Sequence, residues 1–361
     1  MLYASNRDVV YSWNYDAGSL KNTSAPQILV SNMSNTDHTT RTLLLSQKVP
    51  DMLLVSRGSN SNLDLLARQM NSGHSQIKAF NISNVKQPYD FSNSGTLLAW
   101  GLRNSVGVAE HPQTGGIFSV ENGADDITRD GQDIHENNPG EEMNFHGYLN
   151  GTSYYAQGQN YGYPICHSVW NVSEIPNNGN LTIGSPFSIG DQNATVNDTI
   201  CDSTTIPARL TFQAHWAPLD IKFNSNGTAA WVTSHGSWDR PIPTGYLLFT
   251  VDFVNGQPSE PANSSIAAIP IVANQNTSDC PNSCFRPVGL AWDSKGRLFM
   301  SSDATGEIYV ITRTDGTSIY NSTPTSVAPP TATTSKSSAA GLGVQELNLW
   351  GVIFGMTYLL L

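Results

Sequence analysis

The sequence contains 361 residues, of which 39% are apolar, so it is long enough for one large domain. Its formal net charge is −11 with only 18 lysines and arginines, and the basic surface that captures nucleic-acid phosphates is therefore missing. This composition excludes a nucleic-acid partner and favours a small molecule or a neutral glycan. No helical period is sustained before the C-terminal segment, which predicts an all-β chain.

The chain begins inside a repeated pattern. Residues 1–16 contain a strand that ends in serine, a polar turn and an alternating strand, and residues 298–314 have the same order. No basic-then-apolar signal segment stands at Met1, although features described below predict secretion. We therefore expect that upstream residues supply a signal and the rest of an incomplete first repeat.

A hairpin followed by a third strand recurs along the chain. Its clearest copy covers residues 100–126, where apolar and polar side chains alternate on both sides of a glycine turn. Further hairpins cover residues 42–58, 219–240 and 288–303, and their third strands follow at 76–82, 246–253 and 307–311. Repeats of three or four strands at intervals of tens of residues are typical of a β-propeller. We predict such a propeller over residues 1–315.

Polar side chains recur where the strands of these hairpins begin or end. His38 precedes the first hairpin, Arg103 and Asn104 precede the second, and Arg286 precedes the last. The same corner of successive blades lies on one face of the propeller axis, so these groups should converge. With the carbonyls and carboxylates of the loop 121–126, they suit an anionic ligand that carries a metal ion. Each residue alone is equally consistent with a polar turn or a surface histidine.

Two further stretches contain chemically active side chains. In the sequence SHGSWDR, His235 stands beside glycine and near a tryptophan, which suits a flat ligand that stacks and hydrogen-bonds, or else a packed loop. Glu141, Glu142 and His146 resemble a metal-binding cluster, but adjacent carboxylates usually form a solvated edge. Residues 148–205 show little periodicity and are predicted to form an excursion on the surface.

The cysteines and glycosylation motifs predict an oxidising compartment. Cys280 and Cys284 have the spacing of a small disulfide loop, although C-x3-C could also begin a metal site. No second CxxC or histidine cluster accompanies them, so we expect the disulfides Cys280–Cys284 and Cys166–Cys201. N-glycosylation sequons are dense, for instance at Asn22, Asn32, Asn81, Asn150, Asn171, Asn180, Asn193, Asn226 and Asn321. Together these features place the chain in the secretory pathway.

The composition changes near the C-terminus. Residues 316–338 are rich in Ser, Thr, Pro and Ala, which predicts a disordered, O-glycosylated stalk. Small residues, a short spacer and the apolar tail 347–361 follow. Because a membrane helix needs about 20 apolar residues, this tail is too short, and residues 339–361 indicate a GPI-anchor signal. We expect a secreted protein at the cell surface or wall that contacts the membrane only through its lipid anchor.

Three stretches resemble the motifs of a known family. Residues 37–43, DHTTRTL, resemble the catalytic-histidine segment of the soluble pyrroloquinoline-quinone-dependent (PQQ-dependent) glucose and sorbosone dehydrogenases, with the arginine one place earlier. Residues 101–107, GLRNSVG, resemble their G-x-R-N-x-x-G segment, and residues 158–164, GQNYGYP, resemble their G-x-N-Y-G-W-P segment. The resemblance covers residues 1–315 and is closest to the fungal pyranose or sorbosone dehydrogenase branch. It implies a six-bladed propeller, here with an incomplete first blade, and a quinone and a calcium ion on the axis.

The resemblance also implies roles for single residues. His38 would be the general base. Arg103 and Asn104 would bind the oxygens of the quinone, and Arg103 would also polarise the quinone carbonyl that reacts. Arg286 matches a cofactor-binding arginine, and His235 stands roughly where the bacterial enzymes have a lysine, so it would contact the cofactor.

Calcium would be held by the main-chain carbonyls of Gly123 and Ala124, whose loop follows a matching strand. The implied reaction is the PQQ- and calcium-dependent oxidation of an aldose, a pyranose or a sorbosone-type sugar, with hydride transfer to the quinone and an unidentified external electron acceptor. Two alternatives stay open. A calcium-dependent lactonase propeller would need inward carboxylates and amides at the metal, and a non-catalytic cell-surface propeller would bind glycans without a quinone.

Overall fold

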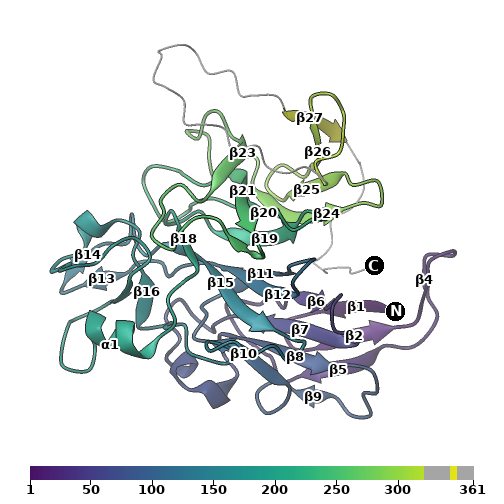
Figure 1. The fold of residues 1–361 in the computed structure, drawn as a ribbon, viewed down its shortest axis with the longest axis horizontal. Helices are drawn as coiled ribbons and strands as arrows, with labels where there is room; N and C mark the ends of the chain where they lie inside the picture. Colours follow the sequence, from purple (N-terminus) through teal and green to yellow (C-terminus); the bar gives the residue numbers. More distant parts are fainter. Residues whose placement is uncertain (321–341, 348–361) are drawn as a thin grey trace.

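The computed structural model describes residues 1–320 and the backbone of residues 342–347 (Figure 1). In this part of the chain, strands form four sheets of four strands and one of five. The first two sheets contain β1 (Leu2–Ser5), β2 (Val10–Trp13), β5 (Gln27–Ser31) and β9 (Tyr89–Asp90), and then β6 (Leu43–Leu45), β7 (Met52–Arg57), β8 (Gln76–Asn81) and β10 (Thr96–Trp100). The other three contain β11 (Ser105–Glu110), β12 (Gly116–Glu121), β15 (Glu141–Tyr148) and β18 (Leu210–Phe212); β19 (Pro218–Phe223), β20 (Ala229–Ser234), β21 (Leu247–Val254), β22 (Gln257–Pro258) and β23 (Ile269–Ala273); and β24 (Pro287–Trp292), β25 (Leu298–Ser302), β26 (Ile308–Arg313) and β27 (Leu342–Leu347).

The first strands of the sheets lie next to one another. β1 contacts β6, β6 contacts β11, β11 contacts β19, and β19 contacts β24. Side-chain hydrogen bonds join neighbouring blades: the Thr42 hydroxyl donates to the carbonyl of Val106, and the Thr233 hydroxyl donates to the carbonyl of Val288 over 2.6 Å. The sheets are therefore blades arranged around a common axis, as in a propeller. Five blades lie within the described residues, and the count of six stays a prediction.

Gly107 on β11 allows two inner strands to approach closely. A Cβ atom at this position would lie 3.1 Å from the Cα of Asp220 on β19 and 2.5 Å from Cγ2 of Val120. A larger residue would therefore push the third and fourth blades apart. Glycine inside a strand often marks such a close approach of two backbones.

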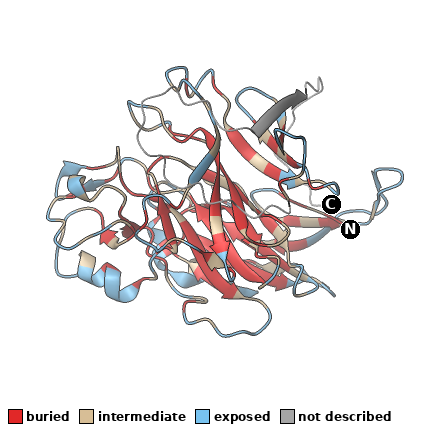
Figure 2. Ribbon diagram, turned by 45° about the horizontal axis from the view of Figure 1, so that its top comes forward, coloured by how far each residue is buried: buried red, intermediate tan, exposed pale blue. Residues whose placement is uncertain are grey.

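Apolar side chains fill the spaces between neighbouring blades. Phe118 and Met143 of the third blade belong to the same buried cluster as Ile221 and Phe249 of the fourth. Other clusters join the first blade to the second, the second to the third, and the fourth to the fifth. Figure 2 shows that the central strands of the blades are buried along most of their length, as in β12 and β20. Because each fully buried large apolar side chain contributes about 1.5–3 kcal/mol, these layers stabilise the ring of blades.

The chain leaves the third blade twice, and the two segments form one excursion with a core of its own. One segment lies within the predicted range 148–205, whereas the other, between β12 and β15, was not predicted. The excursion contains β13 (Thr128–Arg129), β14 (Gln132–Asp133), β16 (Cys166–Ser168), η3 (Val172–Glu174), β17 (Pro186–Ser188) and α1 (Asp198–Thr204). Ile127, Val169 and Phe187 form part of its buried cluster. It lies beside the blades, at the left of Figure 1.

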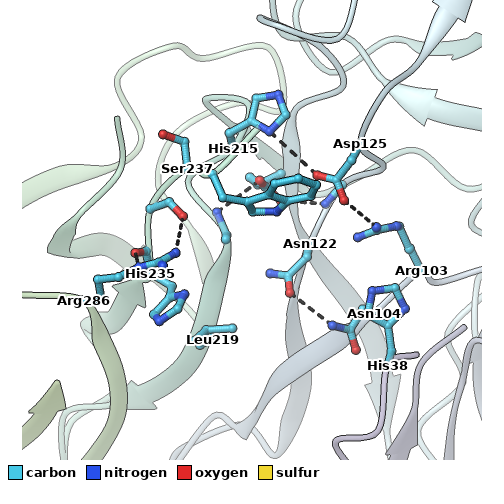
Figure 3. Close-up of a pocket in the computed structure, with 15 residues that line it drawn as sticks. His38, Arg103, Asn104, Asn122, Asp125, His215, Leu219, His235, Ser237 and Arg286 are labelled. Carbon is cyan, nitrogen blue, oxygen red and sulfur yellow. Dashed lines mark hydrogen bonds and ion pairs between the residues drawn. The ribbon is translucent and has the colours of Figure 1, made fainter. Parts of the chain in front are cut away.

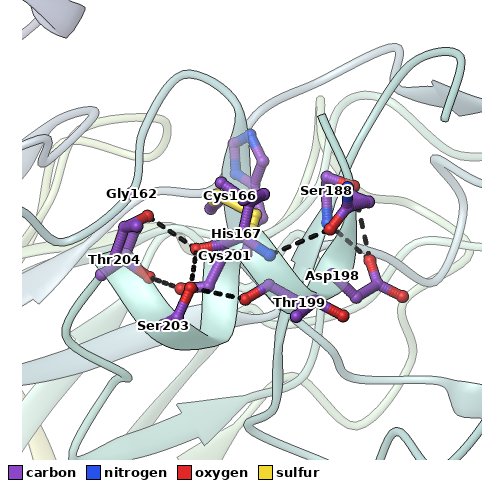
Figure 4. Close-up of a disulfide and its surroundings, with 12 residues drawn as sticks. Gly162, Cys166, His167, Ser188, Asp198, Thr199, Cys201, Ser203 and Thr204 are labelled. Atoms are coloured by element: carbon purple, nitrogen blue, oxygen red, sulfur yellow. Dashed lines mark hydrogen bonds between the residues drawn. A yellow bond between two sulfur atoms is a disulfide. The ribbon is translucent and has the colours of Figure 1, made fainter. Parts of the chain in front are cut away.

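Both predicted disulfides are confirmed. Cys166 on β16 is bonded to Cys201 on α1, with their Cα atoms 5.5 Å apart (Figure 4), and Cys280 is bonded to Cys284. Near the first bond, Arg129 forms an ion pair of 2.7 Å with Asp198. The disulfide and the ion pair together fasten α1 to β16 and β13.

The remaining short elements are β3 (Tyr15–Asp16), β4 (Lys21–Asn22), η1 (Leu65–Arg68) and η2 (Met70–Ser72). Among the described residues, no helix is long and apolar enough to span a membrane. The predicted stalk at 316–338 and the predicted anchor signal at 339–361 lie outside the described residues, except for residues 316–320 and the backbone of β27.

Candidate functional site

A pocket of about 210 Å³ lies at the end of the blades where their first strands begin and their second strands end (Figure 3). Its lining comes from the loops before β6, β11, β19 and β24 and from those after β12 and β20. The lining residues are His38, Arg103, Asn104, Asn122, Gly123, Asp125, Glu141, His215, Ala217, Leu219, His235, Gly236, Ser237, Trp238 and Arg286. One pocket thus gathers every predicted site residue except Ala124, which is 1% exposed and packs into the core of the excursion.

The imidazole of His38 is oriented by Ser59. Its Nδ1 atom lies 2.7 Å from Oγ and 3.2 Å from the carbonyl oxygen of Ser59. The Ser59 hydroxyl donates its own proton to the carbonyl of Ser61 over 2.8 Å, so it must accept from Nδ1–H. This contact leaves Nε2 with a free lone pair. Burial and the nearby charge of Arg103 lower the pKa of His38 to about 4, which keeps the ring neutral at neutral pH.

Arg103 is held by a buried ion pair. Its Nη2 atom lies 2.8 Å from Oδ2 of Asp125, and their side chains are only 6% and 18% exposed. The same Nη2 donates to Oδ1 of Asn62 over 2.9 Å, and the backbone N–H of Arg103 donates to Glu121. Burial raises the pKa of Asp125, while the Arg103 charge acts against this shift. The guanidinium is therefore fixed at the pocket wall before any ligand arrives.

Asn104 is placed by a chain of amides. Its Nδ2 donates to Oδ1 of Asn122 over 3.2 Å, and Asn122 in turn donates to the carbonyl of Pro218 over 2.8 Å. Gly58 lies behind both Asn104 and His38, because an added Cβ would come within 2.6 Å of the Asn104 amide oxygen and 2.8 Å of the His38 Cβ. A side chain at position 58 would displace both groups.

On the opposite wall, Arg286 and His235 form a second polar pair. Arg286 donates from Nε to the His235 carbonyl over 3.0 Å and from Nη2 to the Gly236 carbonyl over 3.1 Å. The His235 ring contacts the carboxylate of Asp303 at 3.0 Å. Burial and the charge of Arg286 lower the pKa of His235, and Asp303 acts against this shift. Figure 3 shows this pair across the pocket from Arg103 and His38.

The loop after β12 offers oxygen atoms that suit a calcium ion. Among the described residues, no donor reaches the carbonyl oxygen of Gly123 or that of Ala124. A carbonyl of a residue as buried as Ala124 is rarely left without a partner. The Gly123 N–H donates to Glu141 over 2.7 Å, which fixes the loop. Main-chain oxygens are calcium ligands, so these residues fit the ion that the family resemblance implies.

Glu141 corrects one interpretation of the sequence. It is 3% exposed, lines the pocket and accepts hydrogen bonds from the N–H groups of Gly123 and Ala217, so the assignment to a solvated edge was wrong. Burial raises its pKa to about 7. Glu142 points to the side of β15 opposite to Glu141, and Ser168 and Asn144 donate hydrogen bonds to it. The two carboxylates therefore do not form the suspected cluster with His146.

Other lining residues were not predicted individually. Asn122 and Asp125 belong to the polar loop 121–126 noted in the sequence, Trp238 belongs to the stretch SHGSWDR, and His215 lies in the loop before β19. Trp238 is 65% exposed although it lines the pocket. The polar loop and the tryptophan beside His235 were the available signals, but the sequence could not show which side chains point inward.

Comparison with known proteins identifies the family. The family model described as TrAA12-like matches residues 1–314. A protein of Hypocrea jecorina named pyrroloquinoline quinone-dependent sugar dehydrogenase is 50% identical over 317 residues, which cover 86% of this chain and 71% of that protein. A pyrroloquinoline quinone-dependent pyranose dehydrogenase of Coprinopsis cinerea is 36% identical over 87% of this chain, and the match spans 45% of that protein's length.

Solved structures agree with this assignment. The calcium structure of the Trichoderma reesei carbohydrate-active enzyme of family AA12 has a TM-score of 0.82 and 50% identity, over 85% of this chain and 76% of that one. The holo form of the pyranose dehydrogenase PQQ domain from Coprinopsis cinerea has a TM-score of 0.79 and 35% identity, over 85% of this chain and 78% of that one. The chain therefore belongs to the TrAA12-like family, the fungal quinone-dependent sugar dehydrogenases that its three motifs resemble.

Proposed function

We propose that this chain oxidises an aldose, a pyranose or a sorbosone-type sugar with pyrroloquinoline quinone and a calcium ion. One observation carries this proposal: His38, Arg103 and Arg286 come from three different blades and line the same pocket. A histidine with a free lone pair in a pocket that also contains two guanidinium groups matches the needs of alcohol oxidation on an anionic quinone. The names of the relatives, which are quinone-dependent sugar dehydrogenases, support the same conclusion.

The pocket has the charges that this cofactor needs. Pyrroloquinoline quinone is a flat polycarboxylate, and guanidinium groups bind carboxylates strongly. Arg103 and Arg286 would bind its oxygens from opposite walls, Asn104 would donate a hydrogen bond, and His235 would contact its edge. The carbonyls of Gly123 and Ala124, which lack donors among the described residues, would hold the calcium ion.

His38 would act as the general base. Its Nδ1–H is bound to Ser59, so Nε2 is the atom that would take the proton of the sugar hydroxyl. When bound, the quinone would supply the hydride acceptor, and calcium would polarise it. The fixed guanidinium of Arg103 would stabilise negative charge as it develops, because it is already oriented by Asp125.

The direct test is reconstitution of the purified chain. We expect dye reduction with a panel of aldoses only when both pyrroloquinoline quinone and calcium are added. A chain that binds no quinone with calcium present and reduces no dye with any sugar would favour the glycan-binding propeller. A chain that hydrolyses lactones with calcium alone would favour the lactonase alternative. The structure argues against a lactonase, because the inward carboxylate of Asp125 is already paired with Arg103.

We also propose that the protein is secreted and held at the cell surface by a lipid anchor. The two disulfides support an oxidising compartment, and the small residues and apolar tail after residue 336 support the anchor. Phospholipase treatment should release the protein from membranes. A mature chain that retains residues 347–361 would contradict the anchor.

A further inference from the structure

A cluster of metal-ligating side chains lies beside the pocket. Asp126 follows β12, His135 follows β14 and Asp239 follows β20, and their ligand atoms all lie within 4.8 Å of one another. None of the three lines the pocket that contains His38 and Arg103. The cluster is therefore separate from the proposed quinone site.

The imidazole of His135 is oriented as in a metal site. Its Nδ1 atom lies 2.5 Å from Oδ1 of Asp133, and its Nε2 atom lies 3.9 Å from Oδ1 of Asp239. The second distance is too long for a hydrogen bond. It is close to the separation expected for two ligands of one ion, each about 2.0–2.2 Å from zinc. Metal-binding histidines usually donate their other N–H to a carboxylate, as His135 can do to Asp133.

The carboxylate of Asp239 is also directed toward this point. Its Oδ2 atom accepts the backbone N–H of Asp126 over 3.1 Å, which leaves Oδ1, the atom that faces His135. The next residue, Arg240, fastens the loop, because its Nη2 lies 3.6 Å from Glu136 and its Nη1 donates to Asn137 over 3.4 Å. The three segments that carry the ligands are thus joined before a metal binds.

We propose that Asp126, His135 and Asp239 bind a divalent ion of the zinc type, with water completing the coordination. An imidazole nitrogen with two carboxylates suits zinc and similar transition metals, whereas calcium prefers a shell of six to eight oxygens. The ion ties the loop after β20, which carries His235 and Trp238 of the pocket wall, to the excursion. It is thus a structural site that stiffens one wall of the pocket.

A neighbouring group, Asp125 with His215 and Asp239, is a weaker candidate for the same ion. Asp125 already pairs with Arg103, and both Asp125 and His215 line the pocket. The two groups share only Asp239, so variants can separate them.

The test uses the full-length chain freed of metal with EDTA and titrated with zinc sulfate, without quinone or sugar, by calorimetry and by thermal unfolding. We expect one zinc ion to bind and to raise the unfolding temperature, and calcium chloride not to displace it. Asp126→Asn and His135→Ala should each weaken zinc binding by at least about tenfold, and Asp133→Asn should weaken it by about 10–100-fold, as loss of a supporting hydrogen bond does. Asp191→Asn is the control, because it removes one exposed negative charge of the excursion that belongs to neither cluster, and it should bind zinc like the wild type.

The outcomes are decisive in either direction. Retained zinc binding in His215→Asn, together with its loss in Asp126→Asn, supports the site. Unchanged zinc affinity in both Asp126→Asn and His135→Ala overturns it, and so does loss of binding in His215→Asn alone. Asp126 is exposed, so its replacement tests the site even if His135→Ala fails to fold. Because no step requires the quinone, failure here leaves the proposed dehydrogenase activity untouched.

Discussion

The Nδ1 atom of His38 lies 2.7 Å from the hydroxyl oxygen of Ser59, and this contact determines which imidazole nitrogen is left free. Ser59→Ala should therefore lower the turnover number by allowing the wrong tautomer, while quinone affinity stays close to that of the wild type. Ser59→Thr keeps the hydroxyl and should restore most of the rate. Single-turnover kinetics with reconstituted protein would check this. Equal rates in the alanine variant and the wild type would show that the Ser59 hydroxyl is not needed and that the Ser59 carbonyl, 3.2 Å from Nδ1, is enough to orient the base.

The depressed pKa of His38 predicts a specific dependence on pH. The folded protein keeps this ring neutral down to about pH 4, whereas the unfolded chain binds the proton near its ordinary value of about 6.5. The unfolded state therefore binds more protons between these values, and the contribution of His38 to stability falls as the pH drops from about 6.5 to 4. Urea unfolding from pH 7 to pH 4 should show a shallower loss of stability in His38→Ala than in the wild type. Parallel curves would contradict the low pKa.

The buried pair of Arg103 and Asp125 predicts that binding and stability can be separated. Arg103→Ala leaves a carboxylate uncompensated and should destabilise the fold by about 3–5 kcal/mol, besides weakening quinone binding. Adding Asp125→Ala should recover much of the stability, because no unpaired charge then remains. It should not recover quinone affinity. A double variant that binds the quinone as tightly as the wild type would exclude Arg103 as a cofactor contact.

Trp238 is the candidate for contact with the sugar ring. It is 65% exposed and still lines the pocket, so its indole face can stack on a pyranose. Aromatic stacking contributes about 0.5–1.5 kcal/mol, so Trp238→Ala should raise KM about 2- to 12-fold with little change in kcat. Tyr155, which is 77% exposed outside this pocket, provides the matched control. An unchanged KM in Trp238→Ala would remove Trp238 from the substrate site.

The sequence predicted the propeller because its hairpins are local. The turn at Gly115 and Gly116 and the alternation around it specify β11 and β12 without any distant partner. Pairing between strands that are distant in the sequence was harder to predict. For example, Tyr89 pairs in parallel with Val30, and no local pattern at either residue predicts this contact. The blade count depends on such distant pairing and on the ends of the chain.

The site was predictable at the level of loops rather than of single atoms. His38, Arg103 and Arg286 were proposed because each precedes an inner strand, and they line one pocket. The carboxylate of Glu141 was misassigned because its surroundings come from distant loops, which donate to it the N–H groups of Gly123 and Ala217. Similarly, the partner that orients His38 is Ser59, which lies 21 residues away on another loop, while the adjacent Asp37 is exposed.

The role of His38 as the base at a quinone-binding pocket is the central claim of the proposed function. The decisive measurement compares wild type and His38→Ala for quinone affinity, by absorbance titration with calcium present, and for sugar-dependent dye reduction. General-base catalysis typically contributes about 10²–10⁴-fold. We therefore expect nearly equal quinone affinity and a loss of turnover in this range. Turnover in His38→Ala equal to that of the wild type, or no quinone binding by the wild type with calcium, would contradict the proposed function.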